Sequence, residues 1–242
     1  MCIRDRFNSD GVISQFEGYD DLKELDWAAY RKKYGNIGRM DLIMESEGDS
    51  TNNYKLSKQA DVTMLFFLLG PEGVIKELRR MGYEFTHEQV VQTIDYYVAR
   101  STNGSSLSNV VNSGVLASIG REEAWDAWKQ AAVVDINDTQ WGTTQEGIHL
   151  GAMSGTVDVI VRAFAGVLIR FDRIEFYPRL PAAMGSVRFR VLFQGQVIDV
   201  RVYHDELVLM SRSHETSRVK VQVFDEQRFL DGGATLHFAL DG

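Results

Sequence analysis

The spacing of apolar residues changes near Leu168. Between residues 53 and 168 apolar residues recur at three- and four-residue steps, a period typical of amphipathic helices. Two such stripes contain Val90, Val91, Ile94 and Tyr97, and Val110, Val111, Val115 and Leu116. Thr86 and Gln89 have the spacing of a capping box and predict a helix start there. Trp125 and Trp128 are expected to lie on one helix face.

Beyond Leu168 the period shortens to two. Val187, Phe189, Val191 and Phe193 alternate with Arg188, Arg190 and Leu192. Residues 197–203, 207–210 and 219–224 predict further strands. Gln194-Gly-Gln196 predicts a hairpin turn between the strand at 187–193 and the strand at 197–203. Strands at this spacing are typical of a small antiparallel β-sandwich.

Helices followed by strands, without alternation, indicate separate domains of an α+β protein. We place the boundary at residues 171–181, where Tyr177-Pro-Arg-Leu-Pro181 reads as extended chain. The divisions are 7–170 and 171–242. Residues 10–19 read as loop or short strand. Residues 1–6 fit no element, and we expect them to be a non-native start attached to an open fragment of a longer protein.

Composition narrows the class of protein. The 242 residues carry 26 Lys and Arg against 34 Asp and Glu, a net charge of -8. An acidic chain is a poor partner for a nucleic-acid backbone, and no apolar run approaches the ~18 residues of a membrane span. The single Cys2 excludes a disulfide framework and a cysteine-based zinc site, and the five histidines show no metal-binding spacing. We expect a soluble, cytoplasmic protein with no metal, no cofactor, and no nucleic-acid or membrane partner.

Ser101-Thr-Asn-Gly-Ser-Ser-Leu-Ser108 runs into a predicted helix that starts near Leu107. The first N–H groups of a helix lack intrahelical partners, and the helix dipole favours an anion there. The segment is therefore a candidate anion site, although, taken alone, it is better explained as an ordinary N-cap with a flexible turn.

Two further polar segments are candidates for chemistry. Lys58 and Gln59 directly precede a helical apolar run and read either as binding groups or as a solvated helix start. Glu146 and His149 are three residues apart and would point the same way at a helix start. Together they could move protons or hold an anion, or His149 could be a satisfied histidine in a tightly packed helix.

Five segments in this order resemble glycoside hydrolase family 65, which contains the inverting phosphorylases of maltose, trehalose, kojibiose and related α-glucosides. They are Gln15-Phe-Glu-Gly18, Tyr54-Lys-Leu-Ser-Lys-Gln-Ala-Asp-Val62, Ser105-Ser-Leu-Ser108, Thr144-Gln-Glu-Gly-Ile-His149 and Tyr177-Pro-Arg-Leu-Pro181. The resemblance covers nearly all of the chain after residue 6. It implies the end of an (α/α) helical barrel followed by the small C-terminal β-sandwich.

The resemblance also implies roles for residues. Lys58, Gln59 and, with less support, Glu146 would bind the glucosyl unit. Asn103, Ser105, Ser106 and His149 would bind inorganic phosphate, the co-substrate. Glu146 could instead orient His149. The catalytic glutamic acid of the family matches no residue here and is expected upstream of Phe7, so no catalytic acid is nominated.

The expected reaction is phosphorolysis of an α-linked disaccharide of the trehalose, maltose or kojibiose type to β-glucose 1-phosphate and an acceptor sugar. A homodimer is compatible with this expectation. The alternatives are a hydrolase of the same family, such as an α-glucosidase or trehalase, and a non-catalytic carbohydrate-binding module. One departure matters: the family usually has a histidine where this chain has Asn103, which can donate a hydrogen bond but carries no charge. Residues 101–108 contain no carboxylate that could activate water, which favours phosphorolysis.

Overall fold

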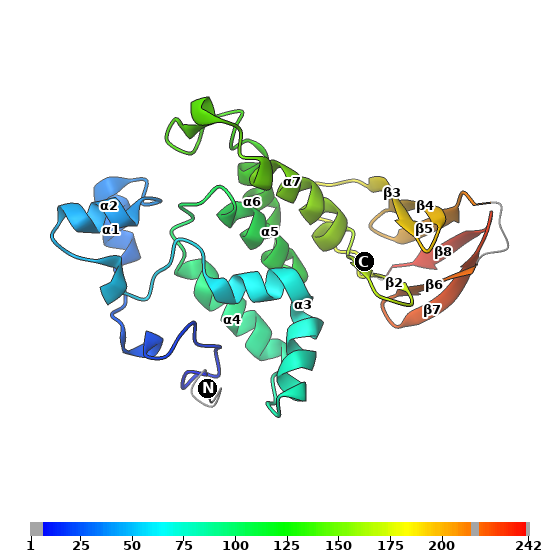
Figure 1. Cartoon of the computed structure of the whole chain (residues 1–242), viewed down its shortest axis with the longest axis horizontal. Coiled ribbons are helices and arrows are strands. Elements are labelled where there is room, and N and C mark those ends of the chain that lie inside the picture. Colours follow the sequence, from blue (N-terminus) through cyan, green and yellow to red (C-terminus); the bar gives the residue numbers. More distant parts are fainter. Residues whose placement is uncertain (1–6, 214–217, 241–242) are drawn as a thin grey trace.

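The computed structural model describes residues 7–213 and 218–240. Figure 1 shows a small helical lobe at one end, a layer of longer helices in the middle and a β-sandwich at the other end. The proposed non-native start, residues 1–6, lies outside the described residues. Within the described residues, no helix is long and apolar enough to cross a membrane.

The helical region contains seven α-helices. They are α1 (Trp27–Tyr34), α2 (Met40–Ser46), α3 (Asp61–Arg80), α4 (His87–Ala99), α5 (Ser108–Ser118), α6 (Glu123–Ala132) and α7 (Leu150–Asp158). Short 3-10 turns lie at η2 (Tyr19–Asp21), η3 (Thr51–Asn53) and η4 (Thr143–Glu146), and α7 continues into a π-helix, η5 (Val159–Phe164). Helix α3 is interrupted at Gly70, whose φ of 70° leaves the helical range one residue before Pro71.

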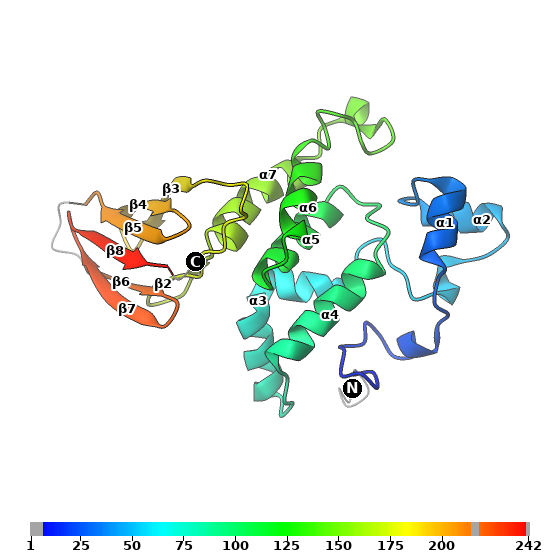
Figure 2. The same ribbon diagram turned by 180° about the vertical axis from the view of Figure 1, so that it is seen from behind.

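Helix α5 is the centre of this layer. It contacts α3, α4, α6, α7 and η5, and its residues 110–117 are all buried. Figure 2 shows α5 beside α6, with α3 and α4 on one side and α7 on the other. The predicted stripes are confirmed except at one position: Val90, Ile94 and Tyr97 are buried in α4, whereas Val91 is half-buried, and Val110, Val111, Val115 and Leu116 are buried in α5.

Two local predictions for the helices are confirmed. The Thr86 hydroxyl accepts from the Gln89 N–H at 3.2 Å, and the Gln89 side chain accepts from the Thr86 N–H at 3.0 Å. The indoles of Trp125 and Trp128 stack with centroids 4.8 Å apart. The helices α1 and α2 were not predicted; they form a lobe with its own small core of Leu25, Ile37, Met40 and Met44.

The sandwich consists of two four-stranded sheets. Their strands are β1 (Val167–Ile169), β2 (Ile174–Phe176), β3 (Val187–Phe193), β4 (Gln196–Val202), β5 (Glu206–Ser211), β6 (Arg218–Val223), β7 (Glu226–Asp231) and β8 (Thr235–Ala239). The sheet orders are β1-β2-β6-β7 and β3-β4-β5-β8. Their facing side chains, among them Phe176, Ile198, Leu209 and Val221, form one buried core.

The predicted β3–β4 hairpin is confirmed. Phe193 pairs with Gln196, so Gln194 and Gly195 alone make the turn, both with positive φ, as a tight type I′ hairpin requires. One feature of the fold prediction is wrong: β2 and β6 pair in parallel, so the sandwich is not wholly antiparallel. A parallel pair needs a crossover, and β3, β4 and β5 lie between the two strands in sequence.

The helical region and the sandwich meet at residues 164–179. The change from helix to strand falls between Phe164 and Val167, and the domain division at 170 and 171 stays a prediction. Gly166 has a φ of 67°, and a Cβ there would lie 2.1 Å from the Tyr177 carbonyl. The Arg179 guanidinium donates to the carbonyl of Ser118 at the end of α5, at 2.6 Å. Backbone and arginine contacts therefore join the two regions.

Candidate functional site

Lys58 and Gln59 lie in the short segment between η3 and α3. The carbonyl oxygen of Lys58 accepts hydrogen bonds from the hydroxyls of Ser101 and Ser108, each at 3.2 Å. Both serines are buried, so the segment is tied to the 101–108 turn through its backbone. The Lys58 side chain stays exposed and Gln59 is half-buried, which leaves the ammonium group available to a ligand.

The 101–108 turn fits closely against its neighbours at Gly104. A Cβ at this position would lie 2.0 Å from the Gly38 carbonyl oxygen and 3.4 Å from Cγ of Lys58. Only glycine therefore allows the turn to approach the Lys58 stem and the α1–α2 lobe this closely.

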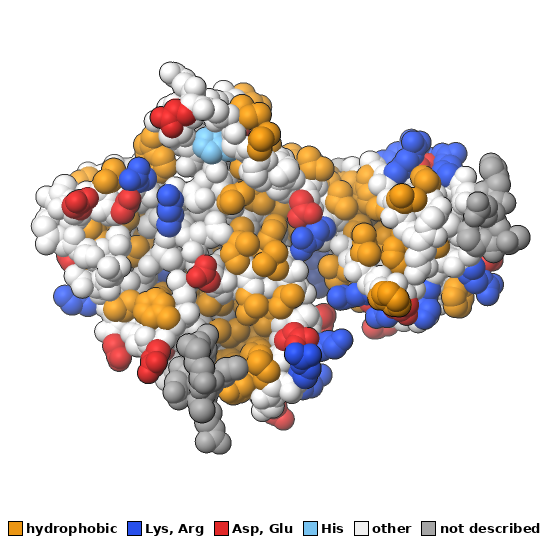
Figure 3. Space-filling model, in the orientation of Figure 1, with side chains coloured by type: hydrophobic (Ala, Val, Ile, Leu, Met, Phe, Trp, Pro, Cys, Tyr) orange, Lys and Arg blue, Asp and Glu red, His pale blue; other side chains and the backbone are white. Residues whose placement is uncertain are grey.

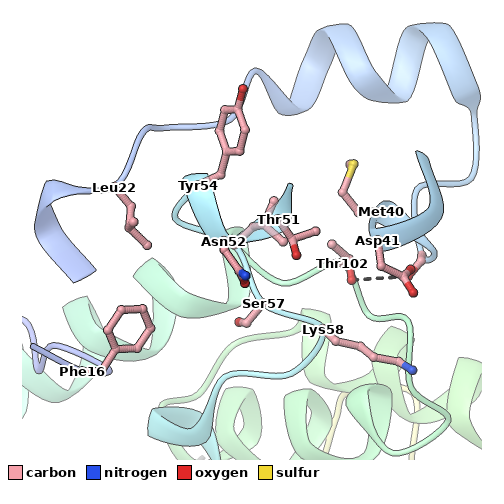
Figure 4. Close-up of a pocket in the computed structure, with 12 residues that line it drawn as sticks. Phe16, Leu22, Met40, Asp41, Thr51, Asn52, Tyr54, Ser57, Lys58 and Thr102 are labelled. Carbon is pink, nitrogen blue, oxygen red and sulfur yellow. Dashed lines mark hydrogen bonds between the residues drawn. The ribbon is translucent and has the colours of Figure 1, made fainter. Parts of the chain in front are cut away.

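A cavity of about 430 Å³ opens beside Lys58. Figure 4 shows Lys58, Thr102 and Asp41 at one end of this cavity and Phe16 and Leu22 at the other. Its remaining lining comes mainly from the α1–α2 lobe and η3, and includes Gly38, Met40, Thr51, Asn52, Tyr54, Leu56 and Ser57. A polar end and an apolar end are the lining expected of a small-molecule site.

Asn103 and Ser105 shape the start of α5. Asn103 has a φ of 56°, a backbone conformation that asparagine tolerates better than most residues. Its Oδ1 accepts from Nδ2 of Asn112 at 2.8 Å, so its own amide nitrogen faces away from that bond. The Ser105 hydroxyl accepts from the Leu107 N–H at 3.3 Å, and its carbonyl accepts from the Ser108 N–H at 3.0 Å.

Ser106 is a free donor of this turn. Among the described residues, none accepts a hydrogen bond from its backbone N–H or its hydroxyl. Helix α5 starts two residues later without a side-chain cap. The turn thus offers the unpaired donors at a helix N-terminus that suit an anion.

His149 precedes α7 and is held by Asp135. The Nδ1 atom lies 2.6 Å from Oδ1 of Asp135, and the His149 backbone N–H donates to Oδ2 at 2.9 Å. The Thr144 hydroxyl donates to Oδ1 at 3.2 Å. The hydrogen bond from His149 is the main reason that the pKa of Asp135 lies below its usual value. The sequence offered no fixed spacing that would have revealed Asp135, fourteen positions before its partner.

Glu146 lies apart from these contacts. It is exposed at the end of η4, and no described residue forms a hydrogen bond or ion pair with its carboxylate. Asp135 orients His149, so the expectation that Glu146 could do so is wrong; its role as a sugar ligand stays a prediction.

Small residues bring the His149 and Ser106 segments together. A Cβ at Gly155 of α7 would lie 2.6 Å from Val110 of α5, and one at Gly151 would lie 3.4 Å from the Leu107 side chain. The start of α7 therefore lies beside the start of α5. From the same loop as His149, the Trp141 ring would meet a Cβ at Gly38 at 2.7 Å, which places this loop next to the cavity lining.

The site thus combines a lysine, a helix-start donor turn and an aspartate-held histidine. Figure 3 shows mixed charges over the helical region and several Lys and Arg side chains on the sandwich. In the described part of the chain, no group of three His, Cys, Asp or Glu side chains could hold a metal ion. The arrangement can bind an anion next to a cavity large enough for a sugar.

Two family models match the chain. The model of the glycosyl hydrolase family 65 central catalytic domain matches residues 3–158, and that of the family's C-terminal domain matches residues 169–228. Two proteins of Mycobacterium tuberculosis strains, both described as uncharacterized glycosyl hydrolases, are 44% identical over 94% of the chain, which covers 17% of their length.

Other relatives carry phosphorylase names. A trehalose 6-phosphate phosphorylase of Lactococcus lactis is 36% identical over 96% of the chain, which covers 30% of its length. A kojibiose phosphorylase of Thermoanaerobacter brockii is 30% identical over 88% of the chain, which covers 25% of its length. The chain thus spans less than a third of these relatives.

A solved structure from the human microbiome, provisionally assigned as a kojibiose phosphorylase, has the same fold. It superimposes with a TM-score of 0.77 at 21% identity, over 98% of this chain and 32% of that one.

Proposed function

The chain belongs to glycoside hydrolase family 65, and we propose that its protein catalyses the inverting phosphorolysis of an α-glucosidic disaccharide. The products are β-glucose 1-phosphate and the released acceptor sugar. Of the substrate types considered, trehalose, maltose and kojibiose, the trehalose type comes first, with trehalose 6-phosphate as the first compound to test. The support for that choice is the 36% identity to a phosphorylase of this name.

The observation that carries the proposal is the unpaired donor turn at Ser106 beside the start of α7 and His149. A phosphate dianion is already a nucleophile, so the protein needs donors that hold it beside the anomeric carbon. A base that deprotonates water is not required. Ser105, Ser106 and the amide groups at the start of α5 would bind the phosphate oxygens, and the Asn103 amide would add a neutral donor.

The carboxylates near this turn are poorly placed to serve water. Both oxygens of Asp135 accept hydrogen bonds from His149, and one also accepts from Thr144. Glu146 is exposed at the end of η4. A hydrolase would need a free carboxylate that contacts the attacking water, so this arrangement favours phosphate as the nucleophile.

The sugar would bind on the Lys58 side of the turn. Phosphate attack forms the new C1–O bond from one face while the bond to the acceptor oxygen breaks on the opposite face, which inverts the anomeric configuration. Lys58 and Gln59 would orient the glucosyl hydroxyls, and the 430 Å³ cavity offers room for a sugar unit. We assign no catalytic acid among the described residues. We also propose that the helical region is part of an (α/α) barrel and that phosphate is the sole co-substrate.

The test is the phosphate dependence of sugar release by the whole protein. With trehalose 6-phosphate, trehalose, maltose and kojibiose as substrates, we expect release from at least one of them only when phosphate is present, with β-glucose 1-phosphate as product. Release of free glucose at the same rate without phosphate would identify a hydrolase. Binding without turnover would identify a carbohydrate-binding module.

A further inference from the structure

The two ring nitrogens of His149 have different partners, and these partners indicate which nitrogens carry a hydrogen. Nδ1 faces Oδ1 of Asp135 at 2.6 Å. The pKa of Asp135 lies below its usual value because His149 donates to it, so near neutral pH the group is a carboxylate that can only accept. Nδ1 therefore carries a hydrogen.

The other nitrogen faces a hydroxyl that has already used its hydrogen. Nε2 lies 3.3 Å from Oγ1 of Thr143, and that hydroxyl donates to the Gln140 carbonyl at 2.7 Å. A hydroxyl has one hydrogen, so toward Nε2 the Thr143 oxygen can only accept. A hydrogen bond at this contact requires Nε2 to donate, so the two contacts together fit an imidazolium with both ring nitrogens protonated.

The low exposure of the Asp135 side chain gives a separate reason for the same charge. Its side chain is 9% exposed, and His149 is its ion-pair partner among the described residues. A buried carboxylate without a counter-charge is costly. A neutral His149 would leave Asp135 in that state, whereas an imidazolium compensates it.

The neighbouring elements supply no competing charge at close range. Residues 101–118, which include the donor turn and α5, contain no ionisable side chain. In the loop of His149, Asp138 accepts from the Thr144 N–H at 3.3 Å and Glu146 is exposed. In α6, Lys129 pairs with Asp126. Two cations of the described chain lie near the donor turn: Lys58, whose stem lies against Gly104, and Arg39, which follows Gly38 and pairs with Asp41.

We propose that Asp135 is a positioning residue that holds His149 as an imidazolium, and that Nε2 gives up its 3.3 Å contact with Thr143 to donate a hydrogen bond to the attacking phosphate. The imidazolium would supply the positive charge that the 101–108 turn, with Asn103, does not contain. The ligand in this inference rests on the proposed function, whereas the charge of His149 rests on the geometry alone.

The charge can be measured without any activity. In the protein labelled with ¹⁵N-histidine, long-range ¹H–¹⁵N spectra at pH 7 are expected to show both ring nitrogens of His149 protonated. Asp135→Asn keeps the side-chain shape and removes the charge, and we expect His149 to become neutral with one ring proton. Asp138→Asn is the matched control, because this carboxylate does not touch the ring, and it should leave the spectrum of His149 unchanged. A neutral His149 in the unmodified protein would overturn the inference.

Phosphate kinetics test the role. Asp135→Asn is expected to raise the KM for inorganic phosphate at least about tenfold, the size expected for loss of one charge-assisted hydrogen bond. The KM for the disaccharide should change less than about twofold, which is a smaller change than the loss of one hydrogen bond to the disaccharide would cause. An unchanged phosphate KM in a folded Asp135→Asn protein would contradict the role.

A second variant covers the case in which Asp135→Asn does not fold. His149→Gln keeps a donor and removes the charge, so it should raise the phosphate KM at a fixed pH; an unchanged KM would again overturn the role. If no disaccharide is phosphorolysed while the spectra show a doubly protonated His149, the proposed function fails and the charge assignment stands. If phosphorolysis is observed with a neutral His149, this inference alone fails.

Discussion

Both regions of the molecule contain ion-paired carboxylates with little side-chain exposure, but their partners differ. In the sandwich, Asp199 is 2% exposed and pairs with Arg190 and Arg212, and Glu175 is 3% exposed and pairs with Arg170 and Arg173. In the helical region, Asp135 pairs with His149. Arginine keeps its charge at every physiological pH, whereas histidine gains and loses a proton. A carboxylate paired with arginine is thus a fixed structural link in the sandwich, whereas a carboxylate paired with histidine, in the helical region, involves a group whose charge can change.

Backbone strain divides in the same way. In the sandwich, the non-glycine residues with positive φ are Gln194 and Phe224, which lie in the β3–β4 and β6–β7 turns. In the helical region they are Asn103, Asp138 and Trp141, which lie in the two loops of the candidate site. Strain serves chain reversal in the sandwich, and in the helical region it shapes the loops that would meet a ligand.

The largest expected effect is a loss of stability caused by a substitution in the core of the sandwich. Phe176 is fully buried between the two sheets, so Phe176→Ala should lower the free energy of unfolding by about 3–5 kcal/mol. The phosphate KM of the folded protein should not change, because Phe176 lies outside the candidate site. Denaturant unfolding and phosphate kinetics measure the two quantities. A raised phosphate KM in the folded variant would show that the sandwich shapes the site.

Lys58→Ala affects the helical region instead. Because the Lys58 side chain is exposed, we expect stability to be unchanged. Turnover should fall about 100-fold, as for loss of one transition-state donor. The fall should be the same with phosphate and with arsenate, since Lys58 is proposed to bind the sugar. Loss with phosphate alone would move Lys58 to the oxyanion site, and undiminished turnover would remove it from the mechanism.

Ser106→Ala separates the nucleophile from the sugar. The phosphate KM should rise about tenfold through loss of one charge-assisted hydrogen bond, and the disaccharide KM should rise less. Ser46→Ala is a matched control, because the Ser46 hydroxyl donates at 2.7 Å to the Ile43 carbonyl of its own helix. Equal increases in both KM values for Ser106→Ala would count against the donor turn as a phosphate site.

The smallest expected effect concerns acid stability. The hydrogen bonds from Arg190 and Arg212 hold the pKa of Asp199 below its usual value, so its folded pKa is lower than its unfolded one, about 3.9. The stability from this pair is present above the unfolded pKa and is lost as pH falls through the folded pKa. Asp199→Asn should therefore be less stable than the unmodified protein at pH 7, and the difference should close below about pH 4. Because both arginines are exposed, the difference is modest; a difference that did not shrink as pH fell below about 4 would contradict this origin.

Features fixed by residues close together in the sequence could be predicted, whereas contacts between residues far apart in the sequence could not. The Thr86–Gln89 capping box and the Gln194–Gly195 turn could be predicted because each is fixed by residues within a few positions. The parallel β2–β6 pair could not, since it joins strands separated by three others. In the site, the motifs identified Ser106 and His149. Asp135 stayed hidden because its contact depends on the strained loop between it and His149, including Asp138 and Trp141.

The central claim is that the turn at Ser105 and Ser106 beside His149 holds an oxyanion. Crystals of the protein soaked in phosphate or vanadate measure this directly. We predict tetrahedral density, or trigonal-bipyramidal density for vanadate, within hydrogen-bond distance of the Ser106 hydroxyl and the His149 ring. An empty turn, or a water molecule held there by a carboxylate, would contradict the account.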